Sequence, residues 1–391
     1  EAQAVSLSEA QVDALGEGTV TVAASQVDEH GNVQEVADAV TSFTIDTIDP
    51  SADQVDATGS MSSDTGAEVV VDADDAGTVM ITATFNEPMD QGVLPTFNLQ
   101  PDVAQTLTAQ DTGSWSDATT FSITYDVSDA NFDTDTVSVD VEGAFDVAGN
   151  PMTDYTADVE FGIDTRNPEV TGIVSDFDDT NFDNVVSDDD PVVSYTVSFS
   201  EPITGMGGGD IAVSGGTLDA GSVVVADDSM SATFSVTAKQ ESVADLTVTI
   251  NNTVVDVHGN ALVPQTSAPE AVDTVNPTAT ISDDQDGFAY DGANTVGYTV
   301  SFSEAITSMV EGDITVSGGI LLPESVVVAD DGMSADFAVL VNNDSSDNVE
   351  VTIGSTVVDL AGNTLIEVSD NLQSVDTINP LVTEIVSSFD D

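Results

Sequence analysis

The sequence predicts an all-β protein in which tandem immunoglobulin-like β-sandwich domains form an extended rod. Three observations indicate this fold class: short stretches rich in Val, Ile and Thr, clusters of turn residues between them, and an internal repeat. Strands separated by turn clusters about every 8–12 residues, in repeats of about 100 residues, are typical of immunoglobulin-like sandwiches. No stretch shows a convincing helical periodicity, so we expect strands and turns throughout.

The strands follow from alternation of apolar and polar residues. The stretches 192–200 (VVSYTVSFS) and 245–256 (DLTVTINNTVVD) both alternate in this way. With Gly, Asn, Asp and Pro between such stretches, each repeat should hold about seven short strands. The chain has no Cys, so the disulfide of antibody domains is absent, and we expect the only tryptophan, Trp115, to be a packing residue.

Three short motifs recur in the same order and define the repeat. An Asp-x-x-Gly-Asn motif occurs at 28–32, 146–150, 256–260 and 359–363. An Asp-Thr motif follows each copy and begins at Asp46, Asp164, Asp273 and Asp376. A Phe-x-Glu motif places an acid at Glu87, Glu201 and Glu304. The motifs predict the end of a domain at 1–46, a variant domain at 47–164, domains at 165–273 and 274–376, and the start of another at 377–391.

The charge of the chain excludes several classes of partner. It has 72 acidic residues against two basic ones, Arg166 and Lys239, which gives a net charge of −70. Such a chain cannot neutralise phosphates, so we expect no binding to nucleic acid, and anionic membrane surfaces should repel it. No apolar run is long enough for a transmembrane helix, so we expect no membrane insertion. High salt or divalent cations would make the charge tolerable.

The order of strands in a sandwich brings acids from separate segments to one end of each domain. In the repeat 165–273 these are the linker Asp164, Glu201 and Asp210 of the connection after the second strand, and the loop 256–260. The opposite end carries acidic loops at 175–184, with Asp178, and, in the next repeat, at 282–287, with Asp284. Each junction between domains should therefore collect carboxylates from two domains and a linker.

Crowded carboxylates with almost no basic partners favour a bound dication. Ca²⁺ accepts about 6–8 oxygen ligands from carboxylates, amide oxygens and carbonyls. The alternative is structural: Asp-x-x-Gly-Asn alone is a plausible β-turn. The recurrence in every repeat favours calcium, with several ions at the junctions. The candidate ligands are Asp46, Glu87, Asp146, Asn150, Asp164, Asp178, Glu201, Asp210, Asp256, Asn260, Asp273, Asp284, Glu304, Asp313, Asp359, Asn363 and Asp376.

Both histidines, His30 and His258, occupy the third position of the Asp-x-x-Gly-Asn motif. The other two copies have Ala148 and Ala361 there. The repeat therefore functions without an imidazole, and the comparison of copies predicts neither a zinc site nor catalysis at the histidines.

The motifs also resemble a known family. The run "DTVNPTATISDD" from Asp273, with "YTVSFSEAIT", "GDITVSGG", "VVVADDGMSADFAV" and "VVDLAGN" after it, resembles the tandem bacterial Ig-like extender domains of giant repeats-in-toxin adhesins. The resemblance is strongest over 165–376 and looser over 47–164. It implies a protein of the bacterial surface, exported by type I secretion, with Ca²⁺ at its domain junctions. The family's ligands would correspond to Asp164, Asp273, Glu201, Glu304, Asp256 and Asp359.

We therefore expect a calcium-rigidified spacer of a large secreted adhesin that acts in surface attachment or biofilm formation. Its partners would be the neighbouring repeats of its own chain, while a distal domain of the longer protein would bind the target. We do not expect an enzyme, because acids are scattered and no catalytic motif recurs. The alternative is a glycan- or ice-binding module, for which the variant domain 47–164 is the best location.

Overall fold

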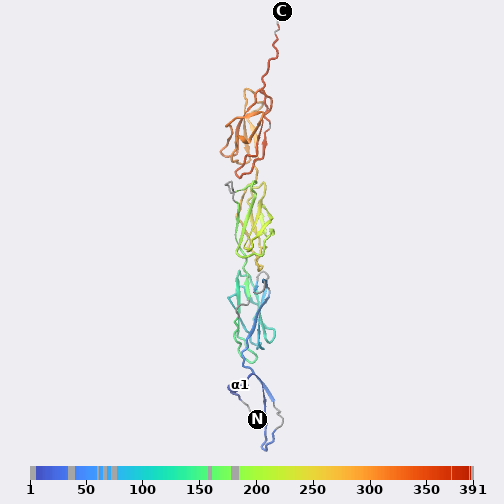
Figure 1. The fold of residues 1–391 in the computed structure, drawn as a ribbon, viewed down its shortest axis with the longest axis vertical. Coiled ribbons are helices and arrows are strands. Elements are labelled where there is room, and N and C mark those ends of the chain that lie inside the picture. The colour runs from blue at the N-terminus through green and yellow to red at the C-terminus, as the bar shows by residue number, and fades with distance from the viewer. Residues whose placement is uncertain are drawn as a thin grey trace. The chain divides into compact units, whose positions relative to one another are not determined.

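The computed structural model describes residues 6–33, 40–59, 61–64, 68–71, 77–156, 161–177, 185–370, 372–386 and 388. Strands dominate these residues, as the fold class predicted (Figure 1). The chain divides into two compact units: Glu1–Asn167 with Val255–Ala261, and Pro168–Val254 with Leu262–Asp391. None of the helices in the described residues has the length and hydrophobicity that crossing a bilayer requires.

One short helix corrects the expectation of strands and turns throughout. Helix α1 (Glu9–Leu15) begins after Ser8, whose backbone N–H donates to Gln11 Oε1 at 2.9 Å. This contact is half of a capping box, which stabilises the first turn of a helix too short for its periodicity to be seen in the sequence. Two 3-10 turns, Gly208–Asp210 and Glu311–Asp313, occupy equivalent places in the second unit.

The first unit contains a two-stranded ribbon followed by a sandwich. The ribbon pairs β1 (Gly18–Ala23) with β2 (Val40–Ile45). One sheet of the sandwich has the order β3 (Ala52–Gly59), β6 (Thr78–Phe85), β10 (Thr120–Val127) and β8 (Leu107–Ala109), with β9 (Ser114–Trp115) also on β10. The other has the order β4 (Met61–Asp64), β5 (Glu68–Val71), β12 (Phe161–Asp164), β11 (Asp133–Glu142) and β7 (Thr96–Gln100).

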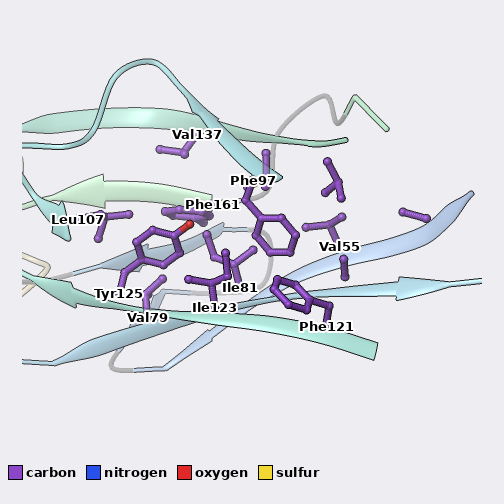
Figure 2. Close-up of a cluster of buried hydrophobic side chains, with 14 of the residues drawn as sticks. Val55, Val79, Ile81, Phe97, Leu107, Phe121, Ile123, Tyr125, Val137 and Phe161 are labelled. Atoms are coloured by element: carbon purple, nitrogen blue, oxygen red, sulfur yellow. The ribbon is translucent and has the colours of Figure 1, made fainter. Parts of the chain in front are cut away.

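Alternation along the strands builds the core of this sandwich. Every second residue of β6 and β10 is buried, and the side chains of Ile81, Phe121 and Ile123 meet those of Phe97 and Phe161 from the other sheet (Figure 2). Burying large apolar side chains in this way contributes about 1.5–3 kcal/mol each. The β-sheet period of two therefore decides which face of each strand forms the core.

Trp115 packs on the edge of the same core. Its ring centroid lies 5.5 Å from that of Phe85 and 5.2 Å from that of Phe121. The tryptophan is thus a packing residue, as the sequence indicated.

The second unit contains two sandwiches of matching topology. The first has the sheet β13 (Val170–Ser175), β15 (Val192–Phe199), β18 (Ser231–Ala238), β17 (Gly216–Val225), the pair β14 (Val185–Val186) and β21 (Ala271–Val272), and the sheet β16 (Ile211–Ser214), β19 (Thr247–Ile250), β20 (Gln265–Thr266). The second has the sheet β22 (Ala279–Asp283), β23 (Thr295–Phe302), β27 (Ser334–Val341), β25 (Gly319–Leu321), with β26 (Val327–Val328) on β27, and the sheet β24 (Ile314–Ser317), β28 (Glu350–Ile353), β29 (Val368–Ser369).

The two predicted strands in this unit differ in outcome. The stretch 192–200 forms β15, whereas 245–256 forms only the four-residue strand β19. The chain turns directly after this strand, at Asn252 and Thr253, where the N–H of Val254 donates to the carbonyl of Asn251 at 3.4 Å. Alternation of Val and Thr alone did not show where the strand would end.

Cross-strand aromatic pairs take the place of the antibody-type core. Tyr195 on β15 faces Phe234 on β18 with ring centroids 5.6 Å apart, and Tyr298 on β23 faces Phe337 on β27 at 5.4 Å. All four side chains are buried. Such pairs contribute about 0.5–1.5 kcal/mol beyond the area that they bury.

Candidate metal centres

Three groups of side chains that could hold a metal ion lie in the described part of the chain. They are Asp46, Glu87 and Asp146; Asp164, Asp256 and His258; and Asp273, Glu304 and Asp359. In each group the ligand atoms lie within 4.8 Å of one another. Each group combines the Asp of an Asp-Thr motif with the Asp of an Asp-x-x-Gly-Asn motif. The structure thus brings together aspartates that lie 86 to 100 positions apart in the sequence, at equivalent places in the repeat.

The Asp-x-x-Gly-Asn loop closes on its own aspartate. Asp146 Oδ1 accepts hydrogen bonds from the backbone N–H groups of Ala148, Gly149 and Asn150 at 2.8, 2.6 and 2.8 Å. Its Oδ2 accepts from Asn150 Nδ2 at 2.7 Å. Burial raises the pKa of Asp146, but these hydrogen bonds outweigh burial and hold the pKa below its ordinary value. The loop therefore keeps this carboxylate ionised and oriented.

Glycine is required in this loop because the backbone turns into the left-handed region. The φ angles are +85° at Gly31, +96° at Gly149, +101° at Gly259 and +92° at Gly362. A residue with a Cβ pays a steric penalty there. The turn interpretation of the motif is thus correct, and the same turn positions the carboxylate of the candidate metal group.

The asparagine of the motif joins the loop to the linker before the domain. Its Nδ2 donates to the backbone carbonyl of the linker aspartate, from Asn150 to Asp46 at 3.1 Å, from Asn260 to Asp164 at 3.1 Å and from Asn363 to Asp273 at 2.9 Å. The same Nδ2 donates to the loop aspartate in each copy. We had expected Asn150, Asn260 and Asn363 as ligands; the structure gives them a positioning role, and metal ligation by their oxygens stays a prediction.

Asn363 makes a further contact within the second unit. Its Oδ1 accepts a hydrogen bond from the backbone N–H of Asp188 at 2.7 Å, and its side chain is fully buried. One amide group thereby ties three segments: the 359–363 loop, the linker at Asp273 and the turn at Asp188.

The threonine of the Asp-Thr motif is the residue that the sequence reasoning missed. Thr274 is buried; its hydroxyl donates to the carbonyl of Lys239 at 2.8 Å and accepts from the N–H of Ser242 at 3.1 Å. Thr377 makes the same contacts with Asn342 and Ser345. These bonds attach the linker to the domain that it leaves and so fix the aspartate before it. The recurrence of Thr in all four copies of the motif was the available signal.

The groups carry uncompensated negative charge. Burial, followed by the charges of Asp46 and Asp146, raises the pKa of Glu87. Burial, followed by Asp359 and Asp273, raises the pKa of Glu304. A carboxyl resists ionisation in this way when like charges surround it and no cation offsets them.

Four other predicted ligands, Asp210, Asp284, Asp313 and Asp376, belong to none of the three groups. Asp210 and Asp313 hold their own turns, with the hydroxyls of Thr253 and Thr356 donating to them at 2.6 Å. Asp284 accepts from the N–H of Gly297 at 2.9 Å, and Asp376 from that of Ile378 at 3.3 Å. Glu201 belongs to the second unit, and Asp178 lies outside the described residues. Their roles as ligands stay predictions.

The middle group contains a histidine that the comparison of repeats set aside. His258 Nδ1 lies 2.8 Å from Asp164 Oδ2, and both side chains are largely buried. Burial, followed by the charge of Asp256 among the raising causes, raises the pKa of Asp164. This group therefore differs in ligand chemistry from the two groups made of carboxylates alone.

The variant sandwich has a cavity of about 600 Å³ at its side. Apolar side chains of Phe97, Leu99, Leu107 and Tyr125 line it, with the polar Asn98 and Asp102 among the other lining residues. The connection from β7 to β8 runs over Pro101–Thr106, whereas single glycines, Gly215 and Gly318, make the equivalent connections in the second unit. Asp102, Val103 and Ala104 of this longer connection line the cavity.

Comparison with known proteins identifies the domain type. Residues 164–271 match the family model described as a bacterial Ig-like domain. No curated protein matches the chain. Solved structures that resemble it include invasin, a bacterial integrin-binding protein, at 14% identity and a TM-score of 0.33, covering 92% of this chain and 65% of invasin.

Two further structures resemble the chain. The S-layer protein rSbsC does so at 14% identity and a TM-score of 0.19, covering 86% of this chain and 55% of that protein. Mouse cadherin-23 EC22-24 does so at 14% identity and a TM-score of 0.26, covering 76% of this chain and 90% of the cadherin fragment. The chain spans less than two thirds of invasin and of the S-layer protein. TM-scores of this size establish no shared fold, so the sheets and the family match carry the assignment of Ig-like domains.

Proposed function

We propose that this chain is a calcium-stabilised extender region of a bacterial cell-surface adhesin. The observation that carries the proposal is the recurrence of linker and loop carboxylates in one group at equivalent positions of the repeat. The donor set fits the ion, because Ca²⁺ is bound by hard oxygen ligands at flexible geometry. The raised pKa values of Glu87 and Glu304 support the same assignment, since a dication would relieve the repulsion that raises them.

Each residue of a junction would have a definite task. Asp273, Glu304 and Asp359 would supply carboxylate oxygens, and Asp46, Glu87 and Asp146 would do so in the first unit. The bound ion would supply positive charge that links a linker to the domain after it. Bending at the junction would then separate oxygens from the ion, so calcium would stiffen the array of domains.

The wider setting of the protein follows from the resemblance and the family match. A bacterial Ig-like domain suits a protein of the cell surface, where millimolar calcium would fill sites with the affinity of extracellular modules, about 10⁻⁴–10⁻³ M. Type I secretion, a role in biofilm formation and a distal binding domain are part of the proposal through the resemblance to repeats-in-toxin adhesins. Its partners would be the neighbouring domains of the same chain.

Thermal unfolding and small-angle scattering of the full chain test this function. We expect calcium to raise the melting temperature and the maximum dimension relative to chelator, and Asp146→Asn to remove part of both effects. The exposed Asp347, which lies in none of the three groups, provides the control Asp347→Asn. Equal melting temperatures and dimensions with calcium and with chelator would refute the proposal.

The cavity of the variant domain favours a second candidate function, ligand binding by residues 47–164. Its volume of about 600 Å³ lies in the range of small-molecule sites, about 300–1,000 Å³, and its lining mixes apolar and amide side chains. This matches a glycan better than the flat face that ice requires. A glycan array should then show binding that Leu99→Trp, which fills the cavity, abolishes; the absence of any bound glycan would exclude this function.

A further inference from the structure

We propose that the group Asp164, Asp256 and His258 is a site for a first-row transition metal such as Zn²⁺, and that it differs in this respect from the two groups made of carboxylates. The inference shares the junction geometry of the proposed function, but it does not depend on calcium at the other groups. Nothing in the comparison of the repeats predicted it, because only one of the four loops brings a histidine to a linker aspartate in the described structure.

The ligand chemistry separates this site from the others. The groups at Asp46 and Asp273 offer oxygen alone, which suits Ca²⁺. His258 adds an imidazole nitrogen, and imidazole with carboxylate is a donor set for zinc, nickel and copper ions. Imidazole suits zinc, copper, iron and nickel ions, whereas carboxylates, carbonyls and water suit Ca²⁺ and Mg²⁺, so the histidine favours a transition metal over Ca²⁺.

The backbone prepares the three ligands before a metal arrives. Asp164 ends strand β12, and the N–H of Arg166 donates to its Oδ1 at 3.0 Å, which leaves Oδ2 facing His258 Nδ1 at 2.8 Å. Asp256 Oδ1 accepts from the N–H of His258 at 2.7 Å, so the loop that holds the carboxylate also holds the imidazole. Small shifts would separate Nδ1 and Oδ2 enough for a metal with bonds of about 2.0–2.2 Å to both.

Two residues of the group are buried and the third is partly exposed to solvent. Asp164 and Asp256 are 8% and 1% exposed, and the side chain of His258 is 22% exposed. The two carboxylates give the group a charge that a dication neutralises, and the histidine is the most exposed of its three residues. Without metal, the imidazole keeps its place through the contact with Asp164.

The two histidines give a matched pair of variants. His30 occupies the same loop position in the copy at 28–32, but it is exposed and lies in none of the three groups. His258→Ala creates the residue that the loops at 146–150 and 359–363 already have, so the variant should fold. In the opposite direction, Ala148→His places an imidazole at an exposed position beside Asp46 and Asp146.

Zinc titration of the full chain, by calorimetry with calcium in excess, tests the inference. We expect one zinc equivalent for the wild type and for His30→Ala, and a second one for Ala148→His. Removing a residue that only supports a metal ligand lowers metal affinity by about 10–100-fold. His258→Ala removes a ligand itself, so it should lower the affinity for zinc by at least that factor. With Co²⁺, the visible absorption spectrum should show nitrogen ligation that His258→Ala removes.

The outcomes distinguish this inference from the calcium proposal. No zinc uptake by the wild type, equal uptake by His258→Ala, or no second equivalent in Ala148→His would overturn the zinc site, whatever calcium does. A calcium-dependent melting temperature in His258→Ala would leave the calcium proposal intact. Loss of the calcium effect alone, with zinc still bound through His258, would overturn the calcium proposal and keep the zinc site.

Discussion

Replacing Glu304 by glutamine should change stability in opposite directions with and without calcium. A carboxylate oxygen of Glu304 lies within 4.8 Å of a carboxylate oxygen of Asp273 and of one of Asp359. At 4.8 Å two unit charges repel by about 0.9 kcal/mol at a dielectric constant of 80 and about 3.5 kcal/mol at 20. Glu304 is partly exposed, so the lower figure is the better guide, and two neighbours give about 2 kcal/mol.

In chelator and at low salt, Glu304→Gln should therefore raise the melting temperature by roughly 10 °C, since about 1 kcal/mol shifts a domain of this size by about 4–8 °C. In calcium the order should reverse, because the variant lacks a ligand. A ligand at a concentration of about 100 times its Kd stabilises a protein by about 2.7 kcal/mol. The variant would lose most of this stabilisation by calcium. Differential scanning calorimetry at both conditions measures the two shifts.

The stability difference between Glu304→Gln and the wild type should depend on pH. The pKa of Glu304 is raised above its ordinary value of 4.5 by burial and by Asp359 and Asp273. A raised pKa in the folded state means that ionisation costs stability as pH rises through that pKa. The advantage of glutamine in chelator should thus be present at pH 7 and disappear below about pH 4.5. A lower melting temperature for Glu304→Gln in chelator at pH 7 would refute the electrostatic argument.

Three further changes test the scaffold around the groups. Thr274→Val should lower stability by about 1 kcal/mol in calorimetry, because it removes the hydrogen bonds of a buried hydroxyl to partly buried backbone groups of Lys239 and Ser242, whereas Thr280→Val at an exposed position should not. Asn363→Ala should speed hydrogen exchange of the Asp188 amide, which loses its acceptor; unchanged exchange would contradict that role. Asp256→Ala should remove metal at the Asp164 group and leave the other groups filled, a loss that stoichiometry by native mass spectrometry measures.

The fold could be predicted from the sequence because its signals are local and repeated. Alternation placed β15 correctly, and the motifs identified the linker and loop aspartates that the fold brings together. The end of β19 could not be predicted in this way, since the turn that follows it is closed by a backbone hydrogen bond from Val254 to Asn251, which the alternation of side chains does not show. Helix α1 was missed because seven residues are too few for periodicity, and its cap at Ser8 involves one side chain.

The site was predictable as a list of acids but not as a geometry. Asp146 and Asp359 were expected as ligands from their recurrence, and they do lie beside the linker aspartates. Asp313 was expected in the same place as Asp359, yet it belongs to none of the three groups and accepts a hydrogen bond from the N–H of Val310 at 2.7 Å. Acids that recur only to form a turn and acids that also lie beside a linker aspartate give the same sequence signal, and only the structure separates them.

The contacts of the junctions divide into two kinds, and this division explains how so acidic a chain can keep its ligands ordered. Asn150 and Asn363 tie loop to linker with neutral donors, and Thr274 ties linker to domain; neither kind of bond needs a cation. The carboxylates are therefore held close together before an ion binds, at a cost in repulsion. Because the scaffold has already removed much conformational freedom, a dication that binds loses little free energy to ordering and gains the relief of that repulsion. Weakening the neutral bonds should then reduce metal affinity even though no ligand is changed.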